Sequence, residues 1–278
     1  MNSIIRADNL VKTYGATTAL AGVSLAVSPG ESVAIMGASG SGKTTLLHTL
    51  AGVITPDSGS VMLSTGAGTQ DVARMSDNER SRLRRESFGF VFQQGLLLPE
   101  LTALENVALS AMLTGASRTD AEARARMWLA QLGLGGMEDR RIGQLSGGQA
   151  QRVAIARAQV TGAPVVFADE PTGALDSRTS SEVMTALIAA TAGQGRTLIV
   201  VTHDRTVATR CSRIIEMRDG RIAGTWAAPQ AEGTPGASSA QPNAPRQDSP
   251  VPAVTASHPD ALLAAVAMPT SARAGDAR

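Results

Sequence analysis

Short apolar runs alternate with longer stretches of helical periodicity along the first 226 residues of the chain. The clearest apolar runs cover residues 32–36, 165–168 and 198–202, and glycine, proline or charged residues flank each of them. Such runs are typical of buried parallel strands, because helices cover both faces of a parallel sheet. The alternation therefore predicts an α/β domain with a largely parallel sheet.

Helical periodicity dominates residues 102–159, and residues 120–132 form the clearest amphipathic segment. This pattern predicts a helical subdomain, at about residues 95–160, inserted into the sheet domain. After Trp226 the composition changes to Pro, Ala, Ser, Gln and Gly, which cannot bury enough apolar surface to offset the entropy of ordering. We therefore assign residues 1–226 to one domain and predict that residues 227–278 are a disordered tail.

The composition bears on three questions: whether the chain binds nucleic acid, whether it forms disulfides, and whether it spans a membrane. The 278 residues carry 25 basic and 24 acidic side chains, so the chain has no excess of positive charge with which to bind nucleic acid. The single cysteine, Cys211, excludes an internal disulfide, suits a reducing cytosol, and is expected to be buried and inert. No apolar run approaches the roughly 20 residues that cross a bilayer, so we expect that the chain spans no membrane.

A glycine-rich loop follows the apolar run at residues 32–36. It matches the pattern G-x-x-x-x-G-K-[ST], as Gly37-Ala38-Ser39-Gly40-Ser41-Gly42-Lys43-Thr44. In such a loop the backbone amides surround phosphates, the lysine reaches the β- and γ-phosphates, and the final hydroxyl binds Mg²⁺. A small-residue turn with a chance lysine is the alternative, but the strand before the motif and the helical run after it favour a phosphate loop.

Two adjacent carboxylates, Asp169 and Glu170, end the apolar run at residues 165–168. Beside a phosphate loop, Asp169 is expected to hold Mg²⁺, directly or through water. Glu170 is then expected to orient or deprotonate the attacking water as a general base. Taken alone, two acids would more simply begin a solvated loop. The phosphate loop reverses that interpretation.

A second glycine-rich motif precedes a long helical run. It reads Leu145-Ser146-Gly147-Gly148-Gln149, followed by Gln151-Arg152-Val153-Ala154-Ile155-Ala156-Arg157-Ala158. Its serine can cap the helix, and its glycines leave bare amides at the positive helix end, so this start can bind an anion by the same logic as the first loop.

With this signature the sequence resembles the ATP-binding cassette (ABC) family over about residues 3–226. The resemblance implies a P-loop NTPase cassette that has a mainly parallel core sheet, a small antiparallel β part and an inserted helical subdomain. It also implies a head-to-tail dimer of two copies, in which each ATP lies between the phosphate loop of one subunit and the signature of the other. ATP and Mg²⁺ are the implied cofactors.

The resemblance carries over to single residues. It implies that Tyr14 stacks on adenine, that Asp176 communicates across the dimer, and that His203 contacts the γ-phosphate. Gln93 is implied to touch Mg²⁺ and the attacking water and to link the site to a permease. A histidine at a strand end more often makes local hydrogen bonds, an interpretation that the family context reverses.

The implied site residues fall into three groups. Catalytic roles fall to Glu170, His203 and Gln93, and metal binding to Thr44, Gln93 and Asp169. The implied ATP-binding residues are Tyr14, Gly37, Ala38, Ser39, Gly40, Ser41, Gly42, Lys43, Thr44, Thr45, Ser146, Gly147, Gly148, Gln149 and Asp176.

Residues 75–107 are similar to the lipoprotein-release and macrolide-export ATPases. This branch implies an ATP hydrolase, peripheral on the cytoplasmic side of the cell membrane, that powers a separately encoded permease for export or extraction of lipoprotein, peptide or drug. ATPases of cell-division or antibiotic-sensing permeases, and amino-acid import ATPases, remain alternatives. A cassette ATPase of DNA repair or translation is another class, but it usually carries paired cassettes, a long coiled coil or zinc-binding cysteines.

Overall fold

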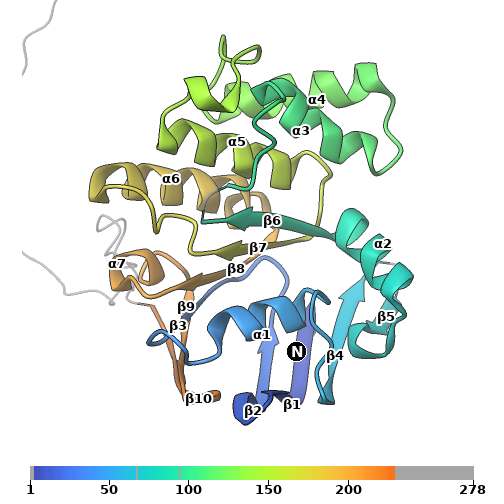
Figure 1. The fold of residues 1–278 in the computed structure, drawn as a ribbon, viewed down its shortest axis with the longest axis vertical. Coiled ribbons are helices and arrows are strands. Elements are labelled where there is room, and N and C mark those ends of the chain that lie inside the picture. Colours follow the sequence, from blue (N-terminus) through green and yellow to red (C-terminus); the bar gives the residue numbers. More distant parts are fainter. Residues whose placement is uncertain (1–2, 67, 94, 229–278) are drawn as a thin grey trace, which may run out of the picture. The chain divides into compact units, whose positions relative to one another are not determined.

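The computed structural model describes residues 3–66, 68–93 and 95–228. Its central sheet has the strand order β10-β9-β3-β8-β7-β6 (Figure 1). All neighbours in this sheet are parallel except β10, which pairs antiparallel with β9 at one edge. The strands are β3 Ser32–Met36, β6 Phe88–Phe92, β7 Val165–Asp169, β8 Thr197–Thr202, β9 Arg213–Arg218 and β10 Arg221–Ala227.

The three predicted parallel strands are confirmed, and two of them are one residue longer than the apolar pattern indicated. Asp169 belongs to β7, where it is in register with Phe92 of β6 and Val201 of β8. Thr197 begins β8, because its amide donates to the Pro164 carbonyl at 2.9 Å. A polar side chain can extend a strand in this way because the ladder is built from backbone groups.

Both faces of the parallel sheet are buried, which explains the continuous apolar runs. Val166 and Ala168 of β7 belong to a core that they share with the helices on one face. Val165 and Phe167, which alternate with them, belong to a second core on the other face. This period of two follows from the strand geometry, in which successive side chains point to opposite faces.

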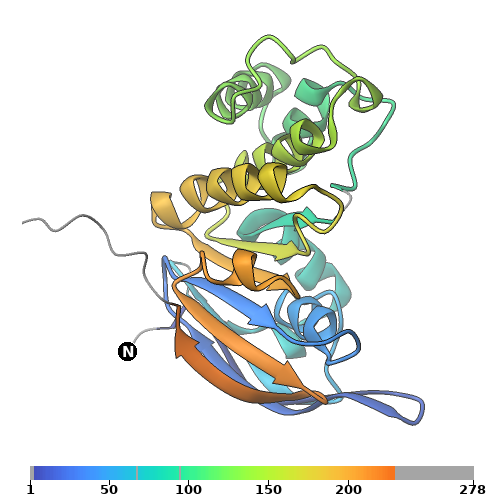
Figure 2. The same ribbon diagram turned by 90° about the vertical axis from the view of Figure 1, so that its left-hand side faces the viewer.

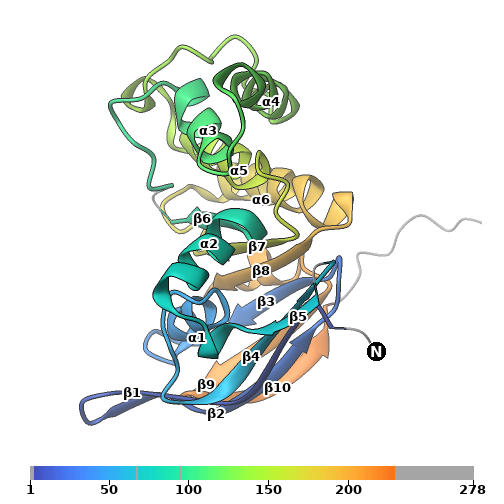
Figure 3. The same ribbon diagram turned by 90° about the vertical axis from the view of Figure 1, so that its right-hand side faces the viewer.

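A smaller antiparallel sheet has the order β2-β1-β4-β5 (Figure 3), and it confirms the predicted antiparallel part. The central sheet approaches it where the Ala21 amide donates to the Gly220 carbonyl at 2.8 Å, so that orange β9 and β10 run near the blue strands in Figure 2. The strands are β1 Ile5–Tyr14, β2 Thr17–Val27, β4 Ser58–Thr65 and β5 Gly68–Asp71.

Helices cover the two faces of the central sheet unequally. Helix α1 packs in the core shared with the antiparallel sheet, whereas α3, α4, α5 and α6 share the other core. Among the described residues no helix is long and apolar enough to span a bilayer. The helices are α1 Lys43–Leu50, α2 Asp77–Ser87, α3 Ala103–Met112, α4 Arg118–Gln131, α5 Gly147–Gln159, α6 Ser177–Ala190 and α7 Arg205–Ala208, with 3-10 turns at Val72–Arg74, Ile142–Gln144 and Ala192–Gln194.

The helix boundaries follow capping groups more closely than the apolar periodicity does. Helix α4 begins two residues before the amphipathic segment predicted at 120–132, because the Ser117 hydroxyl accepts from the Asp120 amide at 3.2 Å. Helix α2 buries no side chain and has no apolar stripe, so its periodicity gave no signal. A capping box between Ser76 and Glu79 fixes its start instead.

The described chain ends slightly beyond the predicted domain boundary. Ala227 is in register with Arg213 in the edge strand, and the amide of the buried Ala228 donates to the Ser212 carbonyl at 3.0 Å. These two residues of the predicted tail are therefore ordered, because backbone pairing holds them without any large side chain. The rest of that tail lies outside the described residues. Cys211 is a buried free thiol, as expected, and burial raises the pKa of its thiol to about 12.

Candidate nucleotide-binding site

The phosphate loop joins β3 to α1, and packing against two other strands fixes its shape. Gly42 has φ +97°, and a Cβ there would lie 2.2 Å from the carbonyl oxygen of Ala19 in β2. A Cβ on Gly37, which has φ +152°, would lie 2.3 Å from the carbonyl oxygen of Met217 in β9. Both positions therefore need glycine for backbone conformation and for space. The two glycines let the loop pack closely against β2 and β9.

Hydrogen-bonding groups of this loop fit a phosphate ligand. Helix α1 begins at Gly42 with no hydrogen bond from a capping side chain. The buried Lys43 ammonium donates to the Ala38 carbonyl at 2.9 Å, which keeps it inside the loop. The Ser41 hydroxyl is buried and has no hydrogen-bond partner among the described residues. Donors held in this way at a helix N-terminus are suited to bind an anion.

A pocket of about 580 Å³ opens over this loop. Its lining comprises residues of the loop and α1 between Ser39 and Thr45, Thr17 and Ala19 of β2, and two side chains from other strand ends, Glu170 and His203. The chain thus brings together residues that are far apart in the sequence, because β3, β7 and β8 are adjacent parallel strands and end at the same edge.

The carboxylate of Asp169 faces the phosphate loop from the end of β7. Its Oδ1 lies 3.4 Å from the Thr44 hydroxyl, which donates to it. Burial raises the pKa of the Asp169 carboxyl above its ordinary value, while the His48 charge and the Thr44 hydrogen bond oppose that shift. A partly buried carboxylate next to a hydroxyl is a pair of oxygen ligands of the kind that Mg²⁺ prefers.

Glu170 occupies a backbone conformation that is uncommon for a residue with a side chain. Its φ is +47°, and its amide donates to the Val201 carbonyl at 2.9 Å, which holds the turn after β7. Glu170 Oε1 lies 2.9 Å from Nδ1 of His203, at the end of β8. Left-handed backbone at a non-glycine residue costs about 1–3 kcal/mol and persists where the surrounding structure imposes it, often at functional sites.

Gln93 stands at the same edge, directly after β6. The register of Phe92 with Asp169 places the two strand ends side by side. The Gln93 amide lies against the turn after β7, where a Cβ on Gly173 would be 2.8 Å from its Nε2. Thr44, Asp169 and Gln93 therefore offer oxygen atoms at one edge, which fits a Mg²⁺ ion that keeps waters and takes few protein ligands.

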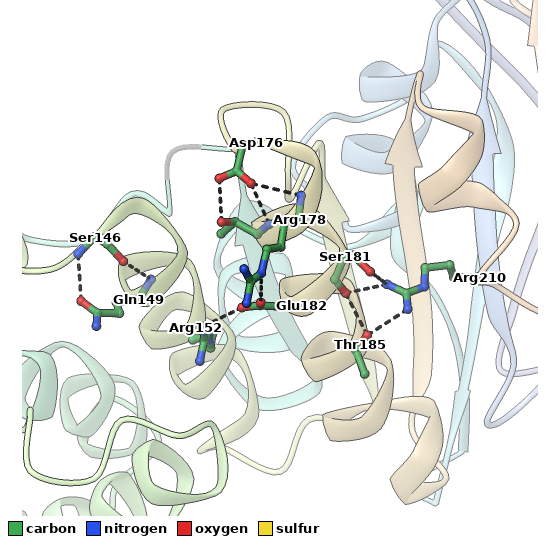
Figure 4. Close-up of polar contacts among 10 residues, drawn as sticks. Ser146, Gln149, Arg152, Asp176, Arg178, Ser181, Glu182, Thr185 and Arg210 are labelled. Carbon is green, nitrogen blue, oxygen red and sulfur yellow. Dashed lines mark hydrogen bonds and ion pairs between the residues drawn. The ribbon is translucent and has the colours of Figure 1, made fainter.

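The signature motif lies at the start of α5, away from this pocket. Ser146 Oγ accepts from the Gln149 amide at 3.3 Å, and Gln149 Oε1 accepts from the Ser146 amide at 2.9 Å (Figure 4). The predicted helix cap is thus confirmed, as a full capping box. None of the residues from Ser146 to Gln149 lines the pocket over the phosphate loop.

Asp176 caps the next helix, α6. Its carboxylate accepts from the amides of Arg178 and Thr179 at 3.1 and 3.0 Å and from the Thr179 hydroxyl at 2.6 Å. These bonds, with that of the Thr179 hydroxyl foremost, hold the pKa of the Asp176 carboxyl below its ordinary value. Sequence reasoning identified Asp176 but missed Thr179, because a threonine in a polar first turn carries no signal of its own.

Tyr14 lies at the end of the β1–β2 hairpin and is not among the residues that line the pocket. Its ring is 49% exposed, and the Lys12 ammonium lies 5.6 Å from the ring centroid. Thr17 and Ala19 of the same hairpin do line the pocket. The sequence did not identify these two residues as pocket-lining, because the alternation of polar and apolar residues around them is that of any exposed strand.

Comparisons with known proteins identify the family of the chain. The family model of the ABC transporter matches residues 20–173. The chain is 48% identical over 222 residues to the macrolide export ATP-binding/permease protein MacB of Burkholderia thailandensis, covering 80% of this chain and 33% of that protein. It is 48% identical over 224 residues to the pyoverdine export ATP-binding/permease protein PvdT of Pseudomonas aeruginosa, covering 79% and 33% respectively. It thus spans about a third of the length of these curated relatives.

Solved structures show the same likeness. The dimeric post-hydrolysis structure of the ATP-binding cassette MJ0796, bound to ADP and Pi, matches with a TM-score of 0.73 at 38% identity, over 81% of this chain and 98% of that one. The cassette cbiO1 from Clostridium perfringens matches with a TM-score of 0.73 at 29% identity, over 82% and 90%. The chain therefore belongs to the ABC transporter family, and its fold is that of the ATP-binding ATPase cassettes of this family.

Proposed function

We propose that this chain is the ATP-hydrolysing cassette of an export transporter, and that it works as a dimer on the cytoplasmic face of a membrane permease. The proposal rests on one observation: Lys43, Asp169 and Glu170 lie at the same edge of the sheet. These side chains come from a phosphate loop and from a neighbouring strand end, and Glu170 and Lys43 line the same pocket. Such a set can bind a nucleotide and activate water beside it.

Binding of ATP relies on groups that the fold holds in place. The amides of the phosphate loop and the Lys43 ammonium bind the β- and γ-phosphates. Thr44, Asp169 and Gln93 are the residues that would hold Mg²⁺, and bound Mg²⁺ supplies neutralisation of the phosphate charge. Tyr14 is proposed to stack on the adenine, a contact to which its exposed ring is suited.

Hydrolysis then needs a base for the attacking water. Glu170 accepts the proton, and the hydrogen bond from His203 at 2.9 Å orients its carboxylate. His203 is 68% exposed and lines the pocket, so its ring can also contact the γ-phosphate. The left-handed backbone of Glu170 turns its side chain from the strand toward His203, while Asp169 stays on the strand.

A second copy of the chain completes the site. The signature residues Ser146 to Gln149 lie outside the pocket of their own chain, so they serve the nucleotide of a partner. The matching MJ0796 cassette is dimeric in its post-hydrolysis state, which supports a head-to-tail dimer for this chain. Asp176, exposed at the start of α6, is then available for contact across the dimer.

An apolar groove supports a permease partner. A cavity of about 670 Å³ is lined by Phe90 and Phe92 of β6 and by the exposed Leu96, Leu98 and Leu113. Exposed apolar surface of this kind suits an apolar segment of another protein. Gln93 directly follows this groove-lining strand, so it connects the groove to the proposed metal site. The relatives MacB and PvdT are export ATP-binding/permease proteins, and we extend an export permease to this chain from them.

The test is ATP hydrolysis by the purified chain, alone and with the membrane protein that co-purifies with it after mild detergent extraction. Lys43→Ala is expected to abolish hydrolysis, because the variant loses the charge that holds the β- and γ-phosphates. Arg74→Ala removes an exposed surface cation and is the matched control, expected to retain full activity. Near-normal hydrolysis by Lys43→Ala would refute the phosphate site, and absence of the protein from membranes would refute the permease partner.

A further inference from the structure

One side chain of α6 contacts both the signature and Asp176. Thr179 lies in the first turn of α6 and is partly buried. Its hydroxyl donates to Asp176 Oδ2 at 2.6 Å. Its methyl group occupies the space beside Gly148, where an added Cβ would lie 2.4 Å from Thr179 Cγ2. The two groups of a single threonine thus contact two motifs on different helices.

Helices α5 and α6 are closely packed at this point. Gly148 is buried and packs beside the threonine methyl, so a larger residue at position 148 would require Thr179 or one of the two helices to shift. The neighbouring Gly147 is exposed, but a Cβ there would lie 3.1 Å from Leu175 Cδ2. Both signature glycines therefore pack on the turn that carries Asp176. Glycine at these two positions therefore allows close packing and also leaves the backbone amides accessible.

We propose that Thr179 is a positioning residue that couples the signature motif to Asp176, so that the two move as one unit. This inference rests on the proposed function, in which the signature binds the partner's ATP and Asp176 acts across the dimer. When the signature closes on that ATP, the methyl contact transmits the shift to α6. Because the Thr179 hydroxyl is hydrogen-bonded to the Asp176 carboxylate, Asp176 then moves together with α6. Thr179 itself touches no nucleotide.

A second connection between the two helices is too weak to replace this one. Glu182 of α6 pairs with Arg152 of α5 at 3.5 Å and with Arg178 at 3.3 Å (Figure 4). Only the pair with Arg152 joins the two helices; Arg152 is 25% exposed and Glu182 is 49% exposed, so water partly screens this pair. Such surface ion pairs contribute little, whereas a close-packed methyl and a charge-assisted hydrogen bond are sensitive to small displacements.

Two conservative variants separate the two halves of the contact. Thr179→Val keeps a methyl against Gly148 and removes the hydroxyl from Asp176, which retains two backbone donors. Thr179→Ser keeps the hydroxyl and removes the methyl. Thr185→Val is the matched control. Thr185 lies farther along α6, where its hydroxyl accepts from the Arg210 guanidinium and contacts neither motif (Figure 4).

The measurements are ATP affinity of the monomer, kcat and KM for hydrolysis, and melting temperature. Thr179→Val is expected to lower kcat roughly tenfold, the cost of a lost hydrogen bond to a charged group, and to leave ATP affinity unchanged. Thr185→Val is expected to match the wild type. Equal kcat values for Thr179→Val and the wild type overturn the inference. A fall in ATP affinity parallel to kcat also overturns it, because that would indicate a general loss of structure.

Rescue provides a test that does not depend on the stability of one variant. Gly148→Ala is expected to lower kcat, because its Cβ collides with the Thr179 methyl. Adding Thr179→Ser removes that methyl, so the double variant is expected to recover at least about threefold in kcat over Gly148→Ala alone. A double variant no better than Gly148→Ala overturns the coupling. If the wild type itself hydrolyses no ATP, the proposed function fails; if it is active and rescue is absent, the coupling alone fails.

Discussion

Two glycine-rich segments of this chain each precede a helix, and the structure prepares them differently for an anion. At the start of α1, Gly42 provides no side-chain cap, and carbonyls of β2 and β9 lie close to the loop glycines. At the start of α5, Ser146 and Gln149 close a capping box, so the Gln149 amide already has an acceptor within its own chain. From the sequence, both starts were expected to bind an anion by the same logic.

This difference indicates that the two sites have different roles in binding ATP. The phosphate loop has a helix start without a side-chain cap and an unpaired Ser41 hydroxyl, so it is suited to bind ATP in a single subunit. In the signature, the Ser146 cap, worth about 1 kcal/mol, already occupies the Gln149 amide, so fewer donors of this helix start are available to a phosphate. The signature is therefore suited to act only on a nucleotide that the partner subunit already holds. The first two of the following experiments test this asymmetry, and the other two test the cassette that carries both sites.

The largest expected effect is that of Glu170→Gln, which keeps size and hydrogen bonding but removes basicity. The chemical step is expected to slow by roughly 10²–10⁴-fold, as is typical when a general base is lost. Lys43 and Asp169 still hold the nucleotide, so the variant is expected to dimerise with ATP and not with ADP. Size-exclusion chromatography with light scattering measures this directly. A monomer at saturating ATP would contradict the shared site, and wild-type turnover would exclude Glu170 as the base.

A large effect on turnover alone is expected from Ser146→Arg. The arginine fills the space before α5, so hydrolysis is expected to fall at least about tenfold, while the phosphate loop binds ATP as before. Ser117→Arg is the matched control, because it removes an N-cap from α4, which is not part of the signature. Calorimetric titration of the monomer with ATP, beside a phosphate-release assay, separates binding from turnover. Loss of ATP affinity in Ser146→Arg would show that the two sites are not independent.

Asp169→Asn is expected to have opposite effects on activity and stability. Burial raises the pKa of the folded Asp169 carboxyl, so its charged form destabilises the metal-free protein, and this cost grows as pH rises from the unfolded-state pKa through the folded-state pKa. Without nucleotide and Mg²⁺ at pH 7, the variant is expected to melt roughly 1–3 °C higher, a small gain because water partly screens the site. Hydrolysis is expected to be lost. The melting difference is expected to vanish below about pH 4, where the wild-type carboxyl is protonated; an unchanged gap there would assign it to another cause.

The smallest effect is expected from truncation after Ala228. Both glycine-rich sites lie within the described cassette, and the composition of residues 229–278 predicts no packing against it. Melting temperature and ATP hydrolysis are therefore expected to stay at wild-type values. Truncation after Gly224 is the contrasting variant, because it removes Trp226 and the pairing of Ala227 with Arg213. A large loss from the first truncation would show that the tail contributes to the cassette.

Much of the fold followed from local patterns. Buried parallel strands were recognised from short apolar runs. The phosphate loop was recognised from a motif whose glycines show positive φ, with close backbone contacts at Gly37 and Gly42. The capping box at α5 was half recognised, since Ser146 was identified as a cap but the reciprocal role of Gln149 was not. Helix α2 was missed because a single apolar residue, Leu83, gives no periodicity to detect.

The sequence by itself determined the groups that this chain can offer: a lysine in a glycine loop, two carboxylates after a strand, and a serine before two glycines. These follow from backbone freedom and side-chain chemistry within a few residues. Only the tertiary structure decided which of them meet. Strand order brings Asp169 to Thr44 and Glu170 to His203, and helix packing places the Thr179 methyl on Gly148. Such contacts depend on register and on close approach between distant segments, and no local pattern encodes a distance of that kind.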